Sequence, residues 1–288
     1  MLNQAIKLSK YSYINKANLT PVGKFERGGT MLRGLWNAAT GMRAQQTKID
    51  VVANNIANVN TNGYKKKDVS FQDLVYQSIE RKGNAVMPAA QGEKKAVVGV
   101  GSRVSGIRSN MRPGMYLQTD SPLDLAIVGD GYFRVLLPDG REGYTRDGNF
   151  RFDGDGNVVT SQGYRVFFPE LPAGGEYKIS TSPDGTVTVT NGEETFLAGQ
   201  ISLAYFNNVN GLEQLGENLL VATPAAGEAV ISPVRNDTQL MQGYLESSNV
   251  DLAEEMVQLM ISQRAYELSS RALRTADEMW GMANQMRR

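Results

Sequence analysis

Residues 32–63 read LRGLWNAATGMRAQQTKIDVVANNIANVNTNG, and the spacing of their apolar side chains predicts one long helix. Apolar or small residues recur at alternating intervals of three and four, with Gln46 in the one polar slot. This is the a/d pattern of a heptad repeat, which favours packing against another helix with left-handed supercoiling. The run Asn58–Gly63 is rich in residues that tolerate turns, so we expect the helix to end there. The positions of this predicted seam are Leu32, Leu35, Ala39, Met42, Ile49, Ala53 and Ile56.

The other end of the chain carries a second helical pattern. Ser248 and Asn249 are good N-cap residues, and the acidic residues that follow place negative charge on the first turns. Apolar residues then recur with a period near 3.6 over residues 250–286, which predicts a second long helix. Its apolar stripe includes Val257, Ile261, Leu268 and Met279.

A narrow apolar stripe on a long helix is not stable alone in water, so each predicted helix needs a partner. Two interpretations stay open. In the first, the two terminal helices form an ordinary two-helix core. In the second, both helices also pack against neighbouring molecules of the same kind.

Between residues 101 and 240 the helical period disappears and short alternating segments take its place. Asp139-Gly140, Asp147-Gly148, Asp184-Gly185 and Asn191-Gly192 are turn signals between them. We expect strands at 123–129, 132–137, 144–146, 150–152, 158–160, 164–168, 177–181, 186–190 and 201–206. The sequence therefore predicts an α+β fold, with an antiparallel β-rich domain inserted between an N-terminal helix over 31–63 and a C-terminal helical segment over 241–288. Residues 64–100 are interpreted as a linker region, with a short helix from Phe71 to Ile79.

Residues 1–30 lack the apolar core of a secretory signal peptide. We interpret them either as a poorly ordered extension or as a segment ahead of a true start at Met31. Glu26-Arg27-Gly28-Gly29 can be encoded by purine-rich codons, which could spell a ribosome-binding site before that methionine.

Composition excludes several classes of function. The chain has no Cys and no His, so Ser-His-Asp, Cys-His and His-ligated zinc chemistry are not available to it. Lys plus Arg equals Asp plus Glu at 30 each, which gives no overall field favouring nucleic acid. No apolar run approaches the roughly 18 residues of a membrane span. We expect a protein that is not an enzyme and that has no cofactor, no metal and no direct membrane insertion.

Two short motifs are weak. Residues 153–157 resemble the start of a calcium loop, but Val158 and Tyr164 stand where Gly and Glu would be needed, so a β-turn is the better interpretation. The segment Gly99–Val104 lacks the third Gly of a dinucleotide-binding fingerprint and is interpreted as a loop.

Longer motifs at both ends of the chain carry a specific resemblance. Six segments resemble the rod and hook axial proteins of the bacterial flagellum: Leu35–Met42, Ala53–Lys65, Gly129–Phe133, Tyr144–Phe150, Gly243–Glu246 and Gln263–Glu267. A further segment, Phe71–Gln77, resembles the distal-rod type of this family. The family-motif residues are Ala53, Asn54, Asn55, Ala57, Asn58, Thr61, Gly63, Tyr64, Gln263, Arg264, Ala265, Tyr266 and Glu267.

The resemblance implies a discontinuous coiled coil of N- and C-terminal helices with a β domain outside it. It implies a structural subunit of the basal-body rod that self-assembles into a helical tube around an export channel and transmits torque to the hook. Its partners would be copies of itself, neighbouring rod and hook proteins and the flagellar export apparatus. A proximal-rod or hook subunit of the same family is one alternative, and a surface binding module on a coiled-coil stalk is another.

Overall fold

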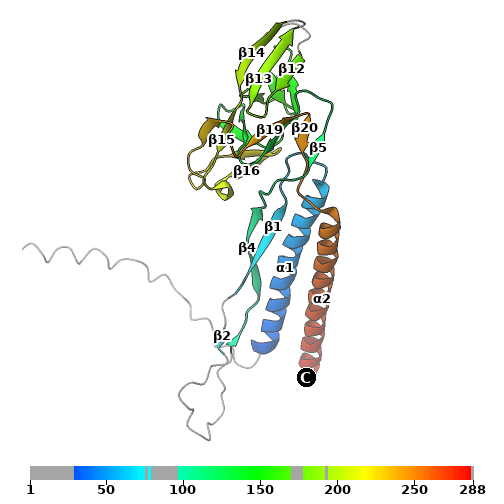
Figure 1. Ribbon diagram of the computed structural model, residues 1–288. Helices are drawn as coiled ribbons and strands as arrows, with labels where there is room; N and C mark the ends of the chain where they lie inside the picture. Colours follow the sequence, from blue (N-terminus) through cyan, green and yellow to red (C-terminus); the bar gives the residue numbers. More distant parts are fainter. Residues whose placement is uncertain (1–28, 75–76, 79–96, 170–177, 192–193, 287–288) are drawn as a thin grey trace, which may run out of the picture.

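The computed structural model describes residues 29–74, 77–78, 97–169, 178–191 and 194–286. These residues form an elongated molecule with a β-rich head above a stalk of two long helices and a narrow strand pair (Figure 1). We call α1, α2, β1 and β4 the stalk, β5 to β20 the head, and the junction between them the neck. Among the described residues, no helix has the length and apolar character needed to cross a membrane.

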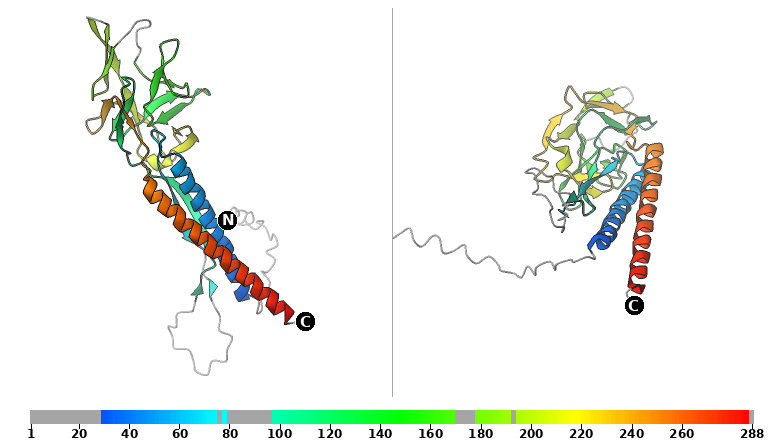
Figure 2. Two further views of the ribbon diagram at one scale, coloured as in Figure 1. Left: turned by 90° about the vertical axis from the view of Figure 1, so that its right-hand side faces the viewer. Right: turned by 90° about the horizontal axis from the view of Figure 1, so that it is seen from below.

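The two stalk helices are α1 (Gly29–Ala57) and α2 (Leu252–Gln285), as the periodicity predicts. They lie side by side and run in opposite directions, with the end of α1 and the start of α2 both at the neck (Figures 1 and 2). The N-cap of α2 differs from the expectation. Asp251, rather than Ser248 or Asn249, caps the helix, because its side chain accepts hydrogen bonds from the backbone N–H groups of Ala253 and Glu254.

An antiparallel strand pair lies along α1 in the stalk. It consists of β1 (Lys67–Asp73) and β4 (Ser102–Ser109), with a register shift between Ser70 and Phe71, and a smaller pair, β2 (Gln77–Ser78) and β3 (Val97–Val98), follows below it (Figure 1). The short helix expected from Phe71 onward is therefore wrong over its described residues. A strand forms there because β4, about thirty residues further along the chain, supplies the pairing partner. Val75 and Ile79 lie outside the described residues.

The head contains a seven-stranded antiparallel sheet in the order β16-β17-β8-β7-β11-β10-β9 and a three-stranded sheet in the order β12-β13-β14. Two-stranded pairs β15-β18, β19-β6 and β20-β5 connect these sheets and the neck. The strands are β5 (Tyr116–Gln118), β6 (Leu125–Val128), β7 (Phe133–Leu136), β8 (Glu142–Thr145), β9 (Phe150–Phe152), β10 (Val158–Thr160), β11 (Arg165–Val166), β12 (Lys178–Thr181), β13 (Thr186–Asn191), β14 (Glu194–Gln200), β15 (Ser202–Tyr205), β16 (Glu213–Gly216), β17 (Leu219–Val221), β18 (Val230–Pro233), β19 (Gln239–Gln242) and β20 (Tyr244–Glu246).

The head has two clusters of buried apolar residues, and the larger one forms its main core. Phe133 and Phe150 meet edge to face at its centre, with ring centroids 5.0 Å apart. Leu125, Ile127 and Val135 are almost completely buried around them. This core forms because the inward positions of successive strands alternate with outward polar positions.

The α+β class is confirmed, and a strand overlaps each of the nine ranges in which one was expected. Sequence reasoning missed β2, β3, β4, β5, β14 and the strands after residue 210. These segments have weak alternation and become strands through pairing, as β14 does with β13. Residues 1–28, and with them most of the predicted extension, lie outside the described residues; α1 begins at Gly29.

Candidate assembly surface and neck

The most deeply buried positions of α2 are polar or small, and Leu259 and Leu273 beside them are half-buried. The buried residues of α2 are Glu255, Ser262 and Ala276. Ser269 lies on the same face, because a Cβ added at Gly41 of α1 would lie 3.7 Å from the Ser269 hydroxyl. The interface within the chain is therefore not the apolar stripe on which an ordinary two-helix core would be built.

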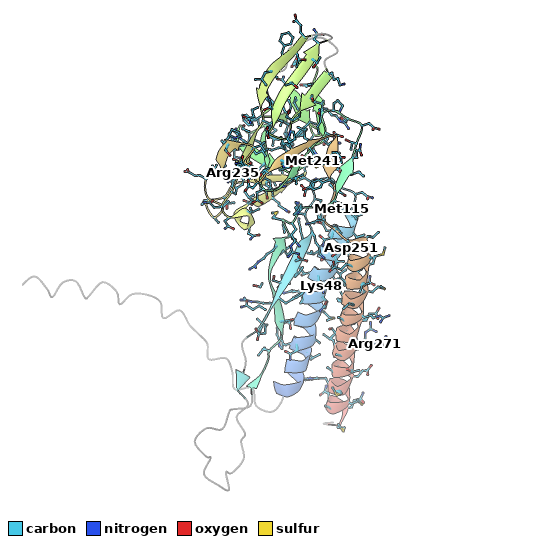
Figure 3. All side chains as sticks on the ribbon, viewed as in Figure 1. Lys48, Met115, Arg235, Met241, Asp251 and Arg271 are labelled. Atoms are coloured by element: carbon cyan, nitrogen blue, oxygen red, sulfur yellow. The ribbon has the colours of Figure 1, made fainter. Side chains whose placement is uncertain are left out.

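The apolar stripe of α2 instead faces away from α1. Val257 is 49% exposed, Ile261 52% and Leu268 64%. Their spacings of four and seven place them on one side of the helix. Further exposed apolar residues of α2 are Leu252, Met256, Met260, Met279, Trp280 and Met282. Since a soluble chain rarely leaves so many large apolar residues on one element uncovered, this outer row is a candidate contact surface. Figure 3 shows the side chains that stand out from this helix.

The predicted seam of α1 is also incompletely covered within the chain. Leu35, Met42, Ile49 and Ile56 are half-buried, and Ala39 and Ala53 are exposed. The buried positions of the helix are Ala44, Val51, Val52 and Asn55. Leu32 lies in α1, but the structure does not describe its side chain.

A buried ion cluster joins the head to the stalk at the neck. The Glu246 carboxylate, whose side chain is fully buried, pairs with the Lys65 ammonium and lies 3.5 Å from Arg146 Nη1. The same carboxylate accepts a hydrogen bond from the backbone N–H of Gly114 at 3.1 Å. Arg146 also donates to the carbonyl oxygen of Gly129 at 2.8 Å. Four distant segments of the chain therefore meet around one carboxylate.

A second cluster fixes the start of α2 against the end of α1. Glu255 accepts a hydrogen bond from the Asn55 side-chain amide at 2.9 Å and pairs with the Lys66 ammonium at 2.8 Å. Asn55 is held in turn by the backbone of Lys67, to which it donates at 3.0 Å and from which it accepts at 2.9 Å. The Tyr64 hydroxyl donates to the Asn55 side-chain oxygen at 3.1 Å.

These contacts shift the ionisation of the neck. Burial, reinforced by the nearby Glu255 carboxylate, raises the pKa of Tyr64 to about 12. Burial opposes the charge on Lys66, but its hydrogen bonds and attraction to Glu255 and Glu254 outweigh this and raise the pKa of Lys66. For Lys65, burial dominates over the attraction of Glu246, and Arg146 adds repulsion, so the pKa of Lys65 is lowered.

The structure separates the family-motif residues into two groups. The N-terminal group runs from the last turns of α1 into the neck, where Asn55, Gly63 and Tyr64 are buried. Gly63 has a φ of +67°, and a Cβ there would lie 2.9 Å from the backbone nitrogen of Asp147, so this position needs glycine. The C-terminal group lies in the middle of α2, where Gln263, Arg264, Tyr266 and Glu267 are exposed and Ala265 is half-buried.

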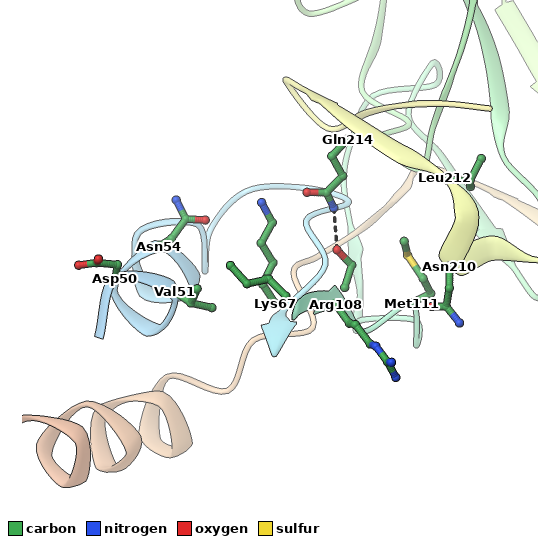
Figure 4. A pocket seen from close by; sticks show the side chains of 11 residues that line it. Asp50, Val51, Asn54, Lys67, Arg108, Met111, Asn210, Leu212 and Gln214 are labelled. Atoms are coloured by element: carbon green, nitrogen blue, oxygen red, sulfur yellow. Dashed lines mark hydrogen bonds between the residues drawn. The ribbon is translucent and has the colours of Figure 1, made fainter. Parts of the chain in front are cut away.

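A groove of about 880 Å³ opens below the head, between α1 and β4 (Figure 4). Asp50, Val51 and Asn54 line it from α1, and Leu212 and Gln214 line it from the head. Gln214 donates a hydrogen bond to the Ser109 hydroxyl at 2.9 Å across its upper edge. The chain has no Cys and no His, so the groove has no thiol or imidazole that could act as a nucleophile or a base. We interpret the groove as a contact surface.

Sequence reasoning missed the role of the neck charges. Lys65, Arg146 and Glu246 stood within the recognised motifs but were assigned no function. One signal could have pointed to Glu246: it ends a short run of strand-forming residues, Tyr244-Leu245, where a lone charge is expected to find a buried partner. The identity of the partners could not be read from the sequence, since Lys65 lies 181 residues away.

Comparisons with known proteins agree at three points of the chain. The family described as "Flagella basal body rod protein" matches residues 35–65, "Flagellar hook protein FlgE/F/G D1 domain" matches residues 126–189, and "Flagellar basal body rod FlgEFG protein C-terminal" matches residues 241–286. These segments cover most of α1, part of the head, and α2 with the strand before it.

Full-length relatives are also similar. "Flagellar basal-body rod protein FlgG" of Borreliella burgdorferi is 40% identical over 267 residues, covering 90% of this chain and 100% of that protein. The protein of the same name from Caulobacter vibrioides is 41% identical over 261 residues, covering 89% and 100%. "Flagellar hook-basal body complex protein FlhP" of Bacillus subtilis is 32% identical over 277 residues, covering 89% and 100%.

Proposed function

The chain belongs to the flagellar basal-body rod protein family, and from this premise we propose that it packs against copies of itself in the rod through the outer face of α2. The family is structural, and its members localise to the flagellar basal body. The chain is accordingly a structural subunit of the flagellar rod. The distal-rod assignment is supported by the higher identity to the relatives named FlgG than to FlhP.

One observation carries the assembly proposal. Val257, Ile261 and Leu268 of α2 are about half exposed or more, while the fully buried positions of the helix are polar or small and Leu259 and Leu273 are half-buried. Burying such a row in water gives roughly 25 cal/mol for each Å² of apolar surface, so a second copy that covers Val257, Ile261 and Leu268 gains association energy. The coiled-coil packing predicted from the heptads is then completed between copies, with the outward residues of α1 contributing.

A repeated contact of this kind builds a tube when the two surfaces that meet are different. Such a head-to-tail contact does not close, and it generates a helical filament. In this proposal the stalks line the tube around the export channel and the heads form its outer layer. The tube contacts neighbouring rod and hook proteins, transmits torque to the hook, and receives subunits through the flagellar export apparatus.

The test is a matched pair of single substitutions. Ile261→Ser removes an apolar side chain from the outer row, and Ile231→Ser removes the same side chain from β18 of the head, where it is 48% exposed. We expect Ile261→Ser to weaken self-association in sedimentation velocity and to reduce swimming when it replaces the native gene. Ile231→Ser should behave like the unmodified protein in both assays. Equal self-association of the two variants would contradict the proposed surface.

A further inference from the structure

The exposed methionines among the described residues lie almost entirely along α2. Those of α2 and its C-cap, which we call the α2 methionines, are between 44% and 83% exposed: Met256, Met260, Met279, Met282 and Met286. Met115, which is also exposed, lies at the neck (Figure 3). The half-buried methionines are Met42, Met111 and Met241.

Three of the α2 methionines continue the outer apolar row towards the end of the stalk. Met279 follows Leu268 by eleven residues, which is about three helical turns. Met282 and Met286 follow at intervals of three and four, so all three lie on the side of Val257. The row is therefore aliphatic next to the head and carries thioethers at the end away from the head (Figure 1).

The other two α2 methionines border the aliphatic part of the row. Met256 directly precedes Val257 and Met260 directly precedes Ile261. Successive residues of a helix lie about 100° apart around its axis, so each methionine stands to one side of the row. The two methionines widen the apolar surface of α2 on that side.

The core of the head is built from other residue types. As far as the structure describes the head, its two clusters of buried apolar residues consist of aromatic, aliphatic and alanine side chains. A chemical change at the α2 methionines therefore leaves these clusters untouched.

The sulfur of methionine is a target for hydrogen peroxide. In this reaction the O–O bond of the peroxide breaks, one oxygen atom bonds to the sulfur, and the other leaves as water with both hydrogens. The sulfur loses two electrons, the peroxide gains two, and the apolar side chain becomes a polar sulfoxide. The chain has no cysteine, so no thiol within it competes for the oxidant.

A sulfoxide affects the fold and the contact between copies differently. In the unassembled chain each α2 methionine is already partly in water, so a sulfoxide there stays hydrated and the stability of the fold changes little. Contact with a second copy removes that water. A sulfoxide without a hydrogen-bond partner is unfavourable in the apolar interface that results.

We propose that the α2 methionines are oxidation sites through which hydrogen peroxide weakens self-association of the chain. This inference rests on the proposed assembly role of the outer row. It adds a reversible modification to that role, because methionine sulfoxide reductases return the sulfoxide to the thioether.

The test oxidises the purified full chain with hydrogen peroxide, removes the excess with catalase and measures sulfoxide at each methionine by peptide mass spectrometry. We expect sulfoxide at the α2 methionines and at Met115 well before it forms at Met241. Sedimentation velocity should then give a dissociation constant for self-association about tenfold or more above that of the untreated sample. Circular dichroism should show the same helix and strand content before and after treatment.

Two variants separate the α2 methionines from the others. The combined variant replaces all five by leucine, which is similar in volume and helix propensity and is not oxidised in this way: Met256→Leu, Met260→Leu, Met279→Leu, Met282→Leu and Met286→Leu. The matched control is Met115→Leu. Each variant is compared with its own untreated sample, so any effect of leucine itself on association cancels. Peroxide should not weaken association of the combined variant, and it should weaken association of Met115→Leu as in the parent.

Enzymatic reduction is a second test that needs no substitution. Methionine sulfoxide reductases A and B, one for each sulfoxide epimer, with dithiothreitol as the reductant, should restore association of the oxidised parent. The proposal is overturned if the parent carries sulfoxide at the α2 methionines and associates as before. It is also overturned if peroxide weakens the combined variant as much as the parent, or if reduction of the sulfoxides does not restore association.

The proposed assembly surface is tested separately, by Ile261→Ser without peroxide. If Ile261→Ser weakens association but oxidation of the parent does not, the surface stands and its sensitivity to peroxide is wrong. If untreated Ile261→Ser associates like the parent but peroxide weakens the parent and spares the combined variant, the oxidation sites stand and the contribution of Ile261 is wrong. A parent chain that is monomeric before treatment contradicts both.

Discussion

The head and the stalk place their large apolar side chains in opposite ways. In the head, Phe133, Leu125 and Ile127 are at most 1% exposed and pack against one another. In the stalk, Ile261 and Leu268 are more than half exposed, and the inner seam holds Ser262 and Glu255. We interpret the head as a unit stabilised by its own core, and the stalk as a surface that is completed by contact between copies.

The largest expected difference between the two regions is in the cost of losing one large apolar side chain. Phe133→Ala should lower the free energy of unfolding by about 3–5 kcal/mol, because it opens a cavity in the core. Ile261→Ala should change it by no more than about 0.5 kcal/mol in the unassembled chain, because the side chain is already half in water. Urea unfolding followed by circular dichroism measures both. If both variants lost a similar free energy of unfolding, the proposed difference between the head and the stalk would be wrong.

The neck should be the next most sensitive region. Glu246→Gln keeps the shape of the side chain but leaves Lys65 and Arg146 charged and buried without their carboxylate. We expect a loss of about 3 kcal/mol in unfolding free energy. Asp139→Asn removes an exposed carboxylate that pairs with Arg141 and serves as the control. Its unfolding midpoint should not move, and a Glu246→Gln midpoint that also stays in place would show that the neck cluster does not stabilise the fold.

The cap of α2 should contribute less. Asp251→Ala removes the acceptor for two backbone N–H groups and should cost about 1 kcal/mol, with fraying of the first turn. Asp251→Asn keeps an acceptor and should stay near the parent stability. Amide hydrogen exchange over residues 252–256 is the direct readout. Equal protection in the two variants would argue against capping by this side chain.

The smallest effect should appear only at alkaline pH. The folded pKa of Tyr64 is raised to about 12, above the value of 10 in an unfolded chain, so its contribution to stability is complete below pH 10 and is lost as the pH rises towards 12. Tyr64→Phe removes this ionisation. We expect the variant to be somewhat less stable at neutral pH, because Asn54 and Asn55 lose a donor, and to lose less stability between pH 10 and 12. Parallel pH curves for the two proteins would contradict the assignment.

Prediction from the sequence succeeded where structure depends on near neighbours in the chain. The heptad and 3.6-residue periods located α1 and α2 within a few residues, and pairs such as Asp139-Gly140 marked real turns, with Gly140 at a φ of +82°. Prediction failed at Phe71, where a strand formed in place of a helix, because its partner Val104 lies far along the chain.

The candidate surface was predicted in part. Val257, Ile261 and Leu268 were recognised as one stripe, but periodicity alone left open whether α1 or another molecule covers them. In the folded chain Glu255, rather than this stripe, contacts the end of α1, and its hydrogen bond with Asn55 spans 200 residues of sequence. No local pattern specifies which of two faces of a helix turns inward when each face repeats every seven residues.

The sequence by itself determined the two terminal helices, the β-rich middle and the absence of thiol and imidazole chemistry, because each follows from composition or from residues a few positions apart. Only the tertiary structure decided that the apolar row of α2 points outward and that buried charges join head to stalk. The physical reason is that a carboxylate such as Glu246 is stable in the interior only when its cations arrive from elsewhere in the chain, and folding alone brings them together.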